Sequence, residues 1–145
     1  MKNWIYWIAM FGLLILTACS PSPQPIDYGS DMCHYCKMTI VDQQHAAEAV
    51  TSKGKAYKFD AIECMVNYLG EKEGQEHAFL LVNDYQQPKE LIPAGDSYYL
   101  ISEAIPSPMG ANLSAFETKA KAEAVQAEKG GEVYSWEALQ KQLNQ

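Results

Sequence analysis

The chain has 145 residues, 48% of them hydrophobic and 11% aromatic, so it is long enough for one domain and too apolar to be disordered. It carries 18 Asp and Glu against 11 basic residues, all of them Lys, which gives a net charge of −7. Because arginine is absent, the chain has no guanidinium for bidentate phosphate contacts, which argues against nucleic-acid binding and phosphate chemistry.

The N-terminal segment predicts a lipoprotein signal. An uncharged apolar run over residues 4–16 follows a lysine and is shorter than the about 20 residues that a membrane-spanning helix needs. Leu16-Thr-Ala-Cys19 resembles a bacterial lipobox, at which the signal is removed and Cys19 is acylated; the alternative is an ordinary signal peptide with an incidental Cys. We expect residues 1–18 to be cleaved and the chain to be anchored in the cell envelope, with the outer membrane slightly favoured by the serine after Cys19.

A proline-rich tether is expected over residues 19–30. Three prolines in Ser20–Pro25 exclude a helix or a central strand and favour a semi-rigid spacer of about 3 Å per residue. The folded domain is therefore expected over residues 31–145, with a single core.

Strands are predicted by short apolar or alternating runs. The first two are expected to pair with each other, and the fourth to be fully buried because its apolar run is unbroken. The predicted strands are residues 38–42, 45–51, 55–59, 78–82, 89–92, 98–102 and 132–134.

Three helices are predicted by start signals, stop signals and apolar spacing. Asp60 with Glu63, and Ser114 with Glu117, resemble capping boxes at the starts of the first two helices. The expected stops are Gly70 for the first helix and Gly130-Gly131 for the second, and the third carries a stripe of Trp136, Leu139 and Leu143. Strands and helices in separate runs predict the α+β class, as a single small domain. Phe59-Asp60 and Phe116-Glu117 each begin a helix after strands, which suggests two ββα-like halves.

Candidate chemistry is concentrated at Cys33-His-Tyr-Cys-Lys-Met38. Two Cys three residues apart can direct both sulfurs to one point, which serves a metal or a disulfide equally well. Redox catalysis is disfavoured because no strand precedes Cys33 and a strand pattern follows Cys36, so the pair lacks a helix N-terminus. Two alternatives stay open. One is a zinc site that combines Cys33, Cys36 and Cys64 with His34, His45 or His77, and the other is a Cys33–Cys36 disulfide with Cys64 in the core.

Methionines shift the balance towards copper. Met38 follows the Cys pair by two residues, and Met109 lies in a loop between Pro108 and Gly110. Thioethers are ligands that zinc hardly uses and Cu(I) favours, and they cannot be lost to a disulfide in an oxidising compartment. A site of two or three soft donors also leaves a coordination position open, which a metal carrier needs because the acceptor's ligand joins before the donor's leaves.

Five motifs occur in an order that resembles the NosL family, lipoprotein copper chaperones for nitrous oxide reductase. They are Cys33-His-Tyr-Cys-Lys-Met38, Phe59-Asp-Ala-Ile-Glu-Cys-Met65, Val82-Asn-Asp-Tyr85, Ser107-Pro-Met-Gly-Ala111 and Glu128-Lys-Gly-Gly-Glu132. The resemblance covers residues 31–145 and implies a periplasmic, non-enzymatic carrier of one Cu(I) for denitrification, with a fold of two ββα-like halves. The family pattern usually reads Cys-x-Tyr-Cys-Gly-Met, so the chain departs from it at Lys37.

The resemblance also implies ligands and partners. Met38 and Met109 are carried over first as copper ligands, Cys33 and Cys36 second, and Cys64 and His34 last. The implied partners are nitrous oxide reductase and its copper-site assembly machinery, with a membrane held through the lipid anchor, no nucleic acid, and a homodimer left open. The alternative is an extracytoplasmic thiol oxidoreductase or a zinc- or heavy-metal-binding protein that uses the Cys pair.

Overall fold

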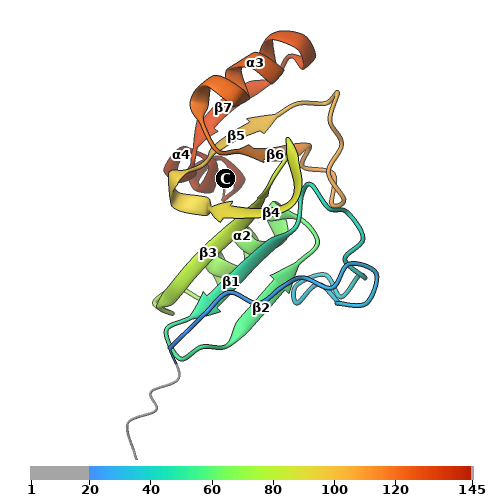
Figure 1. Ribbon diagram of the computed structural model, residues 1–145. Helices are drawn as coiled ribbons and strands as arrows, with labels where there is room; N and C mark the ends of the chain where they lie inside the picture. The colour runs from blue at the N-terminus through green and yellow to red at the C-terminus, as the bar shows by residue number, and fades with distance from the viewer. Residues whose placement is uncertain (1–19, 145) are drawn as a thin grey trace, which may run out of the picture.

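The computed structural model describes residues 20–144, so the predicted signal and Cys19 lie outside the described residues. The described strands form one mixed sheet in the order β2-β1-β3-β6-β5-β7, with β4 also paired to β3 (Figure 1). They are β1 (Ala47–Thr51), β2 (Ala56–Phe59), β3 (His77–Asp84), β4 (Gln87–Pro93), β5 (Tyr98–Ile101), β6 (Leu113–Phe116) and β7 (Glu132–Ser135). The helices are α2 (Ile62–Glu71), α3 (Lys119–Lys129) and α4 (Trp136–Leu143), with a short 3-10 turn η2 (Ala94–Asp96). The predicted α+β class is confirmed.

The sheet contains two copies of a ββαβ arrangement. In the first, β1 lies between β2 and β3, and α2 connects β2 to β3; in the second, β5 lies between β6 and β7, and α3 connects β6 to β7. Every strand pairing within each half is antiparallel. The halves meet where Asp84 of β3 pairs in parallel with Ala115 of β6. The two predicted halves are therefore present, and each gains a strand that returns to its own hairpin.

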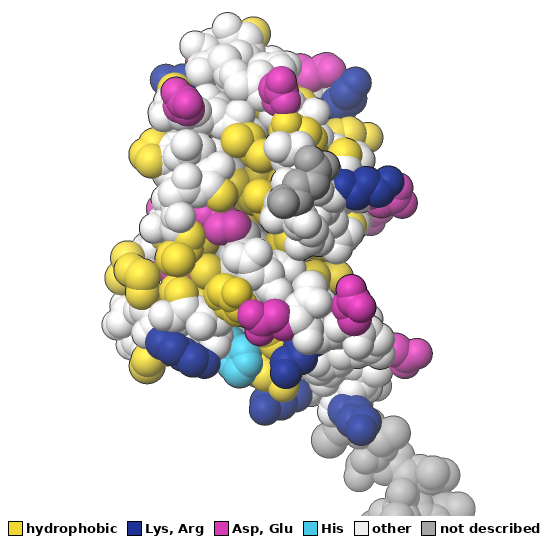
Figure 2. Space-filling view, turned by 180° about the vertical axis from the view of Figure 1, so that it is seen from behind, with side chains coloured by type: hydrophobic (Ala, Val, Ile, Leu, Met, Phe, Trp, Pro, Cys, Tyr) yellow, Lys and Arg dark blue, Asp and Glu magenta, His cyan; other side chains and the backbone are white. Residues whose placement is uncertain are grey.

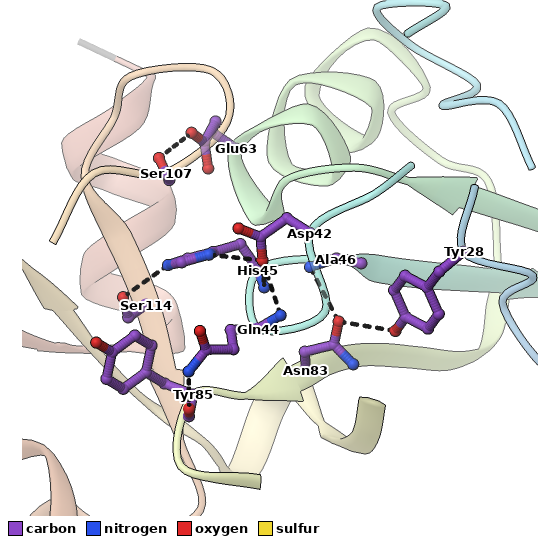
Figure 3. Close-up of polar contacts among 10 residues, drawn as sticks. All are labelled: Tyr28, Asp42, Gln44, His45, Ala46, Glu63, Asn83, Tyr85, Ser107 and Ser114. Atoms are coloured by element: carbon purple, nitrogen blue, oxygen red, sulfur yellow. Dashed lines mark hydrogen bonds and ion pairs between the residues drawn. The ribbon is translucent and has the colours of Figure 1, made fainter. Parts of the chain in front are cut away.

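A buried polar network spans the junction between the halves (Figure 3). The His45 ring has Nδ1 2.9 Å from Asp42 Oδ1 and Nε2 3.1 Å from Ser114 Oγ on β6. Gln44 Nε2 donates to the Tyr85 carbonyl at 2.7 Å. Because the backbone pairing between β3 and β6 is short, these side chains contribute polar contacts where the two halves join.

Two strand predictions are wrong. Residues 38–42 form no strand that pairs with β1; Thr39 makes an isolated bridge with Met32, and Ile40 N donates to the Asp31 carbonyl at 2.9 Å, which closes a local loop. β3 is not buried along its length: its first half pairs with β1 alone, because β4 pairs with β3 only from Leu81 onward, and Phe79 is 36% exposed.

Both capping-box predictions are also wrong. The N-cap of α2 is Ala61, with no side-chain cap, and Gly70 lies inside the helix, which ends one residue later at Glu71. Ser114 belongs to β6, and α3 begins after Thr118, whose side chain accepts a hydrogen bond from Lys121 N at 3.3 Å. The expected end of this helix at Gly130 and the C-terminal helix are confirmed.

The proline-rich segment packs against the first half. Gln24 N donates to Glu48 Oε1 at 2.7 Å, Lys58 Nζ donates to the Pro25 carbonyl at 2.7 Å, and the Ile26 side chain is buried in the core. Packing therefore begins upstream of the domain start expected from the sequence. None of the helices among residues 20–144 has the length and hydrophobicity that a membrane crossing requires.

The two glycines after α3 offer a test of how closely the second half is packed. Gly131 has a φ of 99°, and a Cβ built there would overlap the Ile101 carbonyl of β5, whereas Gly130 has a φ of 71° and open space around its Cβ position. Gly130 has a ψ of −170°, which with its positive φ is a conformation that essentially only glycine adopts. We expect Gly130→Ala to lower the free energy of unfolding by about 1–3 kcal/mol, and Gly131→Ala to lower it by a further about 1–3 kcal/mol for overpacking. Urea unfolding measures both, and equal losses would contradict the packing of this turn against β5.

Candidate metal centre

Three thiols and one carboxylate meet where β2 ends and α2 begins. Cys33, Cys36, Asp60 and Cys64 each offer one ligand atom, and these atoms all lie within 4.8 Å of one another. Cys33, Asp60 and Cys64 are buried, and Cys36 is half-buried. We call these four side chains the thiol cluster. It is approachable on the Cys36 side.

The loop that carries the first two thiols folds back on itself. Cys33 N donates to the Met38 carbonyl at 2.8 Å, and Lys37 N donates to the Cys33 carbonyl at 3.0 Å. His34 N donates to the Lys58 carbonyl of β2 at 2.7 Å, which attaches the loop to the sheet edge. Lys37 adopts a φ of 66°, the left-handed region that glycine occupies without steric cost. The departure from the family pattern therefore falls at the one loop position where a glycine has a conformational advantage.

Asp60 was not predicted as a member of the site. Its Oδ1 accepts hydrogen bonds from Cys36 Sγ at 3.3 Å and from Cys64 Sγ at 3.4 Å, so its carboxylate faces the sulfurs and does not cap the helix. The available signal was the position of Asp60, an acid directly before the helix that carries Cys64.

The three thiols differ in their tendency to ionise. The hydrogen bond with Cys64 is the main cause that lowers the pKa of Cys33 to about 6. Burial raises the pKa of Cys36 to about 11, and the hydrogen bond with Cys33, together with burial, raises the pKa of Cys64. Cys33 is therefore the thiol of the cluster that ionises most readily, and a bound metal ion would displace the thiol protons.

A second carboxylate fixes the loop that carries Met109. Glu63 Oε1 accepts a hydrogen bond from Ser107 Oγ at 2.5 Å (Figure 3). It also accepts one from Ala111 N at 3.3 Å. Both ends of the Met109 turn are therefore attached to the α2 residue that directly precedes Cys64. Glu63, predicted as a capping residue, instead positions this loop.

Both predicted methionine ligands lie on the surface. Met38 is 53% exposed and Met109 44% exposed. Figure 2 shows hydrophobic side chains exposed along one edge of the molecule, among scattered acidic and Lys side chains. The large exposed hydrophobic side chains are Met32, Met38, Val41, Phe79 and Met109.

None of the three His contributes to the thiol cluster, although all three lie within residues 20–144. The His34 ring packs against Tyr57, with ring centroids 4.5 Å apart, and against Tyr68 at 5.5 Å; burial lowers the pKa of His34. His45 is engaged in the network at the junction, and His77 lies at the start of β3. The predicted combination of three Cys with a His is not formed, because Asp60 occupies the fourth place.

The donor set fits a soft or borderline cation. Cys33, Cys36 and Cys64 are free thiols, so the Cys33–Cys36 disulfide considered from the sequence is not formed in this structure. Three sulfurs suit Cu(I), whereas three sulfurs with a carboxylate oxygen also satisfy the four-ligand preference of zinc.

Comparison with known proteins identifies relatives of the whole described domain. The family model named NosL matches residues 25–144. The crystal structure of the copper chaperone NosL from Shewanella denitrificans superimposes with a TM-score of 0.70 and 22% identity, covering 80% of this chain and 93% of that chain. At that identity the likeness shows a shared fold. None of the curated proteins compared with the chain matches it.

Replacing Lys37 tests the strain in the Cys loop. We expect Lys37→Gly to raise the free energy of unfolding by up to about 1 kcal/mol, because the left-handed strain of about 1–2 kcal/mol is relieved while the unfolded chain gains entropy. Lys37→Ala is the matched control, since it also removes the hydrogen bond from Lys37 Nζ to the His34 carbonyl but keeps a Cβ. Urea unfolding of the metal-free proteins compares the two variants. If the glycine variant were no more stable than the alanine variant, the backbone at position 37 would not be strained.

Proposed function

The chain belongs to the NosL family, and from this premise we propose that it is a lipid-anchored, periplasm-facing Cu(I) chaperone that delivers copper for assembly of the nitrous oxide reductase copper centres. The observation that carries the proposal is the meeting of three Cys sulfurs at one point, within 4.8 Å of one another and of Asp60. Such a site binds and releases a metal ion; it requires no catalytic turnover.

Sulfur donors in a buried pocket match the chemistry of Cu(I). Thiolates and thioethers are soft ligands, and Cu(I) prefers them to oxygen and nitrogen donors. Asp60 is a hard donor, and its role is to accept hydrogen bonds from the Cys36 and Cys64 thiols, which orients both sulfurs before the metal arrives. When the thiol protons leave, the negative charge beside Asp60 favours the binding of a cation.

Surface thioethers would serve the entry and exit of copper. Met38 and Met109 are exposed, whereas Cys33 and Cys64 are buried, so a copper ion can meet the thioethers before the thiols. Ligand exchange of this kind proceeds through shared coordination, in which an acceptor's donor atom joins before a carrier's donor atom leaves. The exposed Met32, which lies beside Met38 in the same loop, adds apolar surface on which an acceptor protein would dock.

The proposed acceptors are nitrous oxide reductase and its copper-site assembly machinery, a role taken from the family. The proposed location rests on the lipobox-like Leu16-Thr-Ala-Cys19, where acylation would anchor the chain in the cell envelope. Cys19 then belongs to the anchor and takes no part in metal binding.

Zinc is the second candidate, and Asp60 is the observation that favours it. Three Cys and a carboxylate would give Zn(II) a complete four-ligand site. A zinc site of this kind would be closed and structural, and it would make no use of Met38 or Met109. The two metals therefore predict different consequences for the same substitutions.

Competition with a Cu(I)-specific chelator tests the ligand set. The chain without residues 1–18 is expected to bind one Cu(I). Loss of a group that only supports a metal ligand typically lowers metal affinity about 10–100-fold. Cys33→Ala removes a ligand itself, so we expect a larger loss of Cu(I) affinity. Met38→Ala combined with Met109→Ala should lower the affinity as well, whereas Met32→Ala, which removes another exposed methionine, should not. Unchanged affinity in the double variant would refute the methionine ligands, and stoichiometric binding of Zn(II) alone would refute the copper assignment.

The Glu63 contacts predict an energetic coupling between Glu63 and Met109. Glu63→Gln weakens the charged hydrogen bonds that hold the loop and should lower Cu(I) affinity by about 10-fold, in the range of outer-shell effects. In a Met109→Ala background the same substitution should have no further effect, because the loop then carries no donor. Chelator competition on the unsubstituted chain, the two single variants and the double variant completes this double-mutant cycle. Equal effects in both backgrounds would show that Glu63 does not act through Met109.

A further inference from the structure

The proline-rich segment lies along the first half as a docked strip. Figure 1 shows it crossing β1 and β2 on the side away from α2. Gln24 N donates to Glu48 Oε1 at 2.7 Å, and Lys58 Nζ donates to the Pro25 carbonyl at 2.7 Å. One residue further, the Ile26 side chain enters the hydrophobic core.

Glu48 and Lys58 form a clamp built into the sheet. They are directly opposite each other on β1 and β2, so they reach the segment from neighbouring strands. Glu48 is fully buried, and its carboxylate accepts a hydrogen bond from the backbone N–H of Gln24. A buried carboxylate without that donor would carry a larger desolvation cost, so the fold itself favours the docked segment.

Upstream of the clamp, the segment runs to the turn between β1 and β2. A Cβ built on Gly54 would lie 3.8 Å from Pro21 Cα, which is van der Waals contact. Pro21 therefore lies at the tip of the β1–β2 hairpin. In the sequence, Pro21 follows Cys19, the proposed acylation position, by two residues.

The thiol cluster lies at the opposite end of the same hairpin. β2 begins directly after Lys55 of the turn and ends directly before Asp60 of the cluster. Its four residues span about 13 Å at about 3.3 Å per residue. The hairpin thus has one end beside Pro21 and one end at the metal centre.

We propose that the docked segment orients the domain on the lipid bilayer, with the β1–β2 turn, Ser52–Lys55, facing the lipid headgroups and the thiol cluster facing away from them. The inference rests on the proposed function, which places an acyl anchor on Cys19. A free tether would let the domain rotate above the membrane. A segment docked on the domain from Pro21 onward restricts that rotation. The metal centre is then presented to partner proteins on the aqueous side.

The chemistry of the turn suits a headgroup layer. Lys53 and Lys55 are exposed, and the turn borders an open pocket of about 630 Å³ whose far wall is residues 74–76. Lysines at such a surface each attract anionic lipids by about 1 kcal/mol. Glu76 also lines the pocket, so the orientation depends on the anchor and the clamp more than on charge.

Quenching of tryptophan by lipid-borne bromine tests the orientation. Trp136 is the one tryptophan downstream of Cys19, so Trp136→Phe gives a background to which single tryptophans are added in the acylated protein. Lys53→Trp places the probe at the turn, and Lys129→Trp places the same substitution at the exposed end of α3, in the other half. Vesicles of phosphatidylethanolamine and phosphatidylglycerol carry bromine close to the headgroups. We expect strong loss of fluorescence at position 53 and little loss at position 129.

A variant of the clamp provides the matched control. Gln24→Pro removes the N–H that Glu48 accepts, whereas Gln24→Ala keeps that N–H and removes only an exposed side chain. With Gln24→Pro the quenching at position 53 should fall towards that at position 129, and with Gln24→Ala it should stay unchanged.

The outcomes separate this inference from the function on which it rests. Vesicle-bound protein with equal quenching at the two positions, or with quenching unaffected by Gln24→Pro, would overturn the orientation and leave the copper function intact. Protein that does not sediment with vesicles would overturn the acyl anchor, and the orientation with it. One-to-one Cu(I) binding is measured separately on the same preparations.

Discussion

Lys58 is the residue through which both the N-terminal segment and the Cys loop attach to the sheet. Its Nζ donates to the Pro25 carbonyl at 2.7 Å and pairs with Asp31 Oδ2 at 2.6 Å, and its own carbonyl accepts from His34 N at 2.7 Å. The ion pair is also the main reason that the pKa of Asp31 is lowered. These contacts place the two thiols of the loop at the end of β2, where Asp60 and Cys64 follow in the chain. The thiol cluster exists because β2 holds the loop from one side and continues into α2 on the other.

The resulting cluster has two buried thiols and one half-buried thiol, and the two methionines proposed as copper donors lie outside it on the surface. Cys33 ionises most readily of the three thiols, because its hydrogen bond with Cys64 lowers its pKa, and a thiolate favours a cation. Met38 and Met109 lie on the surface, and Glu63 ties the Met109 loop to the helix that carries Cys64. An arrangement with strong donors inside and weaker donors outside is what a protein needs in order to hold a metal ion and also pass it on.

Much of the fold followed from local patterns, whereas the errors arose where long-range contacts decide the outcome. β2, β4, β5, β7 and the C-terminal helix form close to their predicted positions, because periodicity and turn residues report on local structure. Asp60 and Glu63 match a capping box in sequence, but the same spacing permits side chains that reach away from the helix, and their partners are a thiol and a distant loop. The proline-rich segment has the composition of a free spacer, and only Glu48 and Lys58, far along the chain, make it part of the domain. Cys64 likewise lies close to the Cys pair because of the way β2 connects to α2, and the separation of the three Cys in the sequence did not determine that connection.

X-ray absorption at the copper edge of the Cu(I)-loaded chain tests the central claim most directly, namely that a sulfur site formed by the Cys loop and α2 holds the metal. The account predicts a first shell made of sulfur alone, which loses part of its sulfur scattering in Cys33→Ala. A first shell dominated by nitrogen or oxygen, with the outer scattering typical of imidazole, would contradict it, because none of the three His contributes to the thiol cluster.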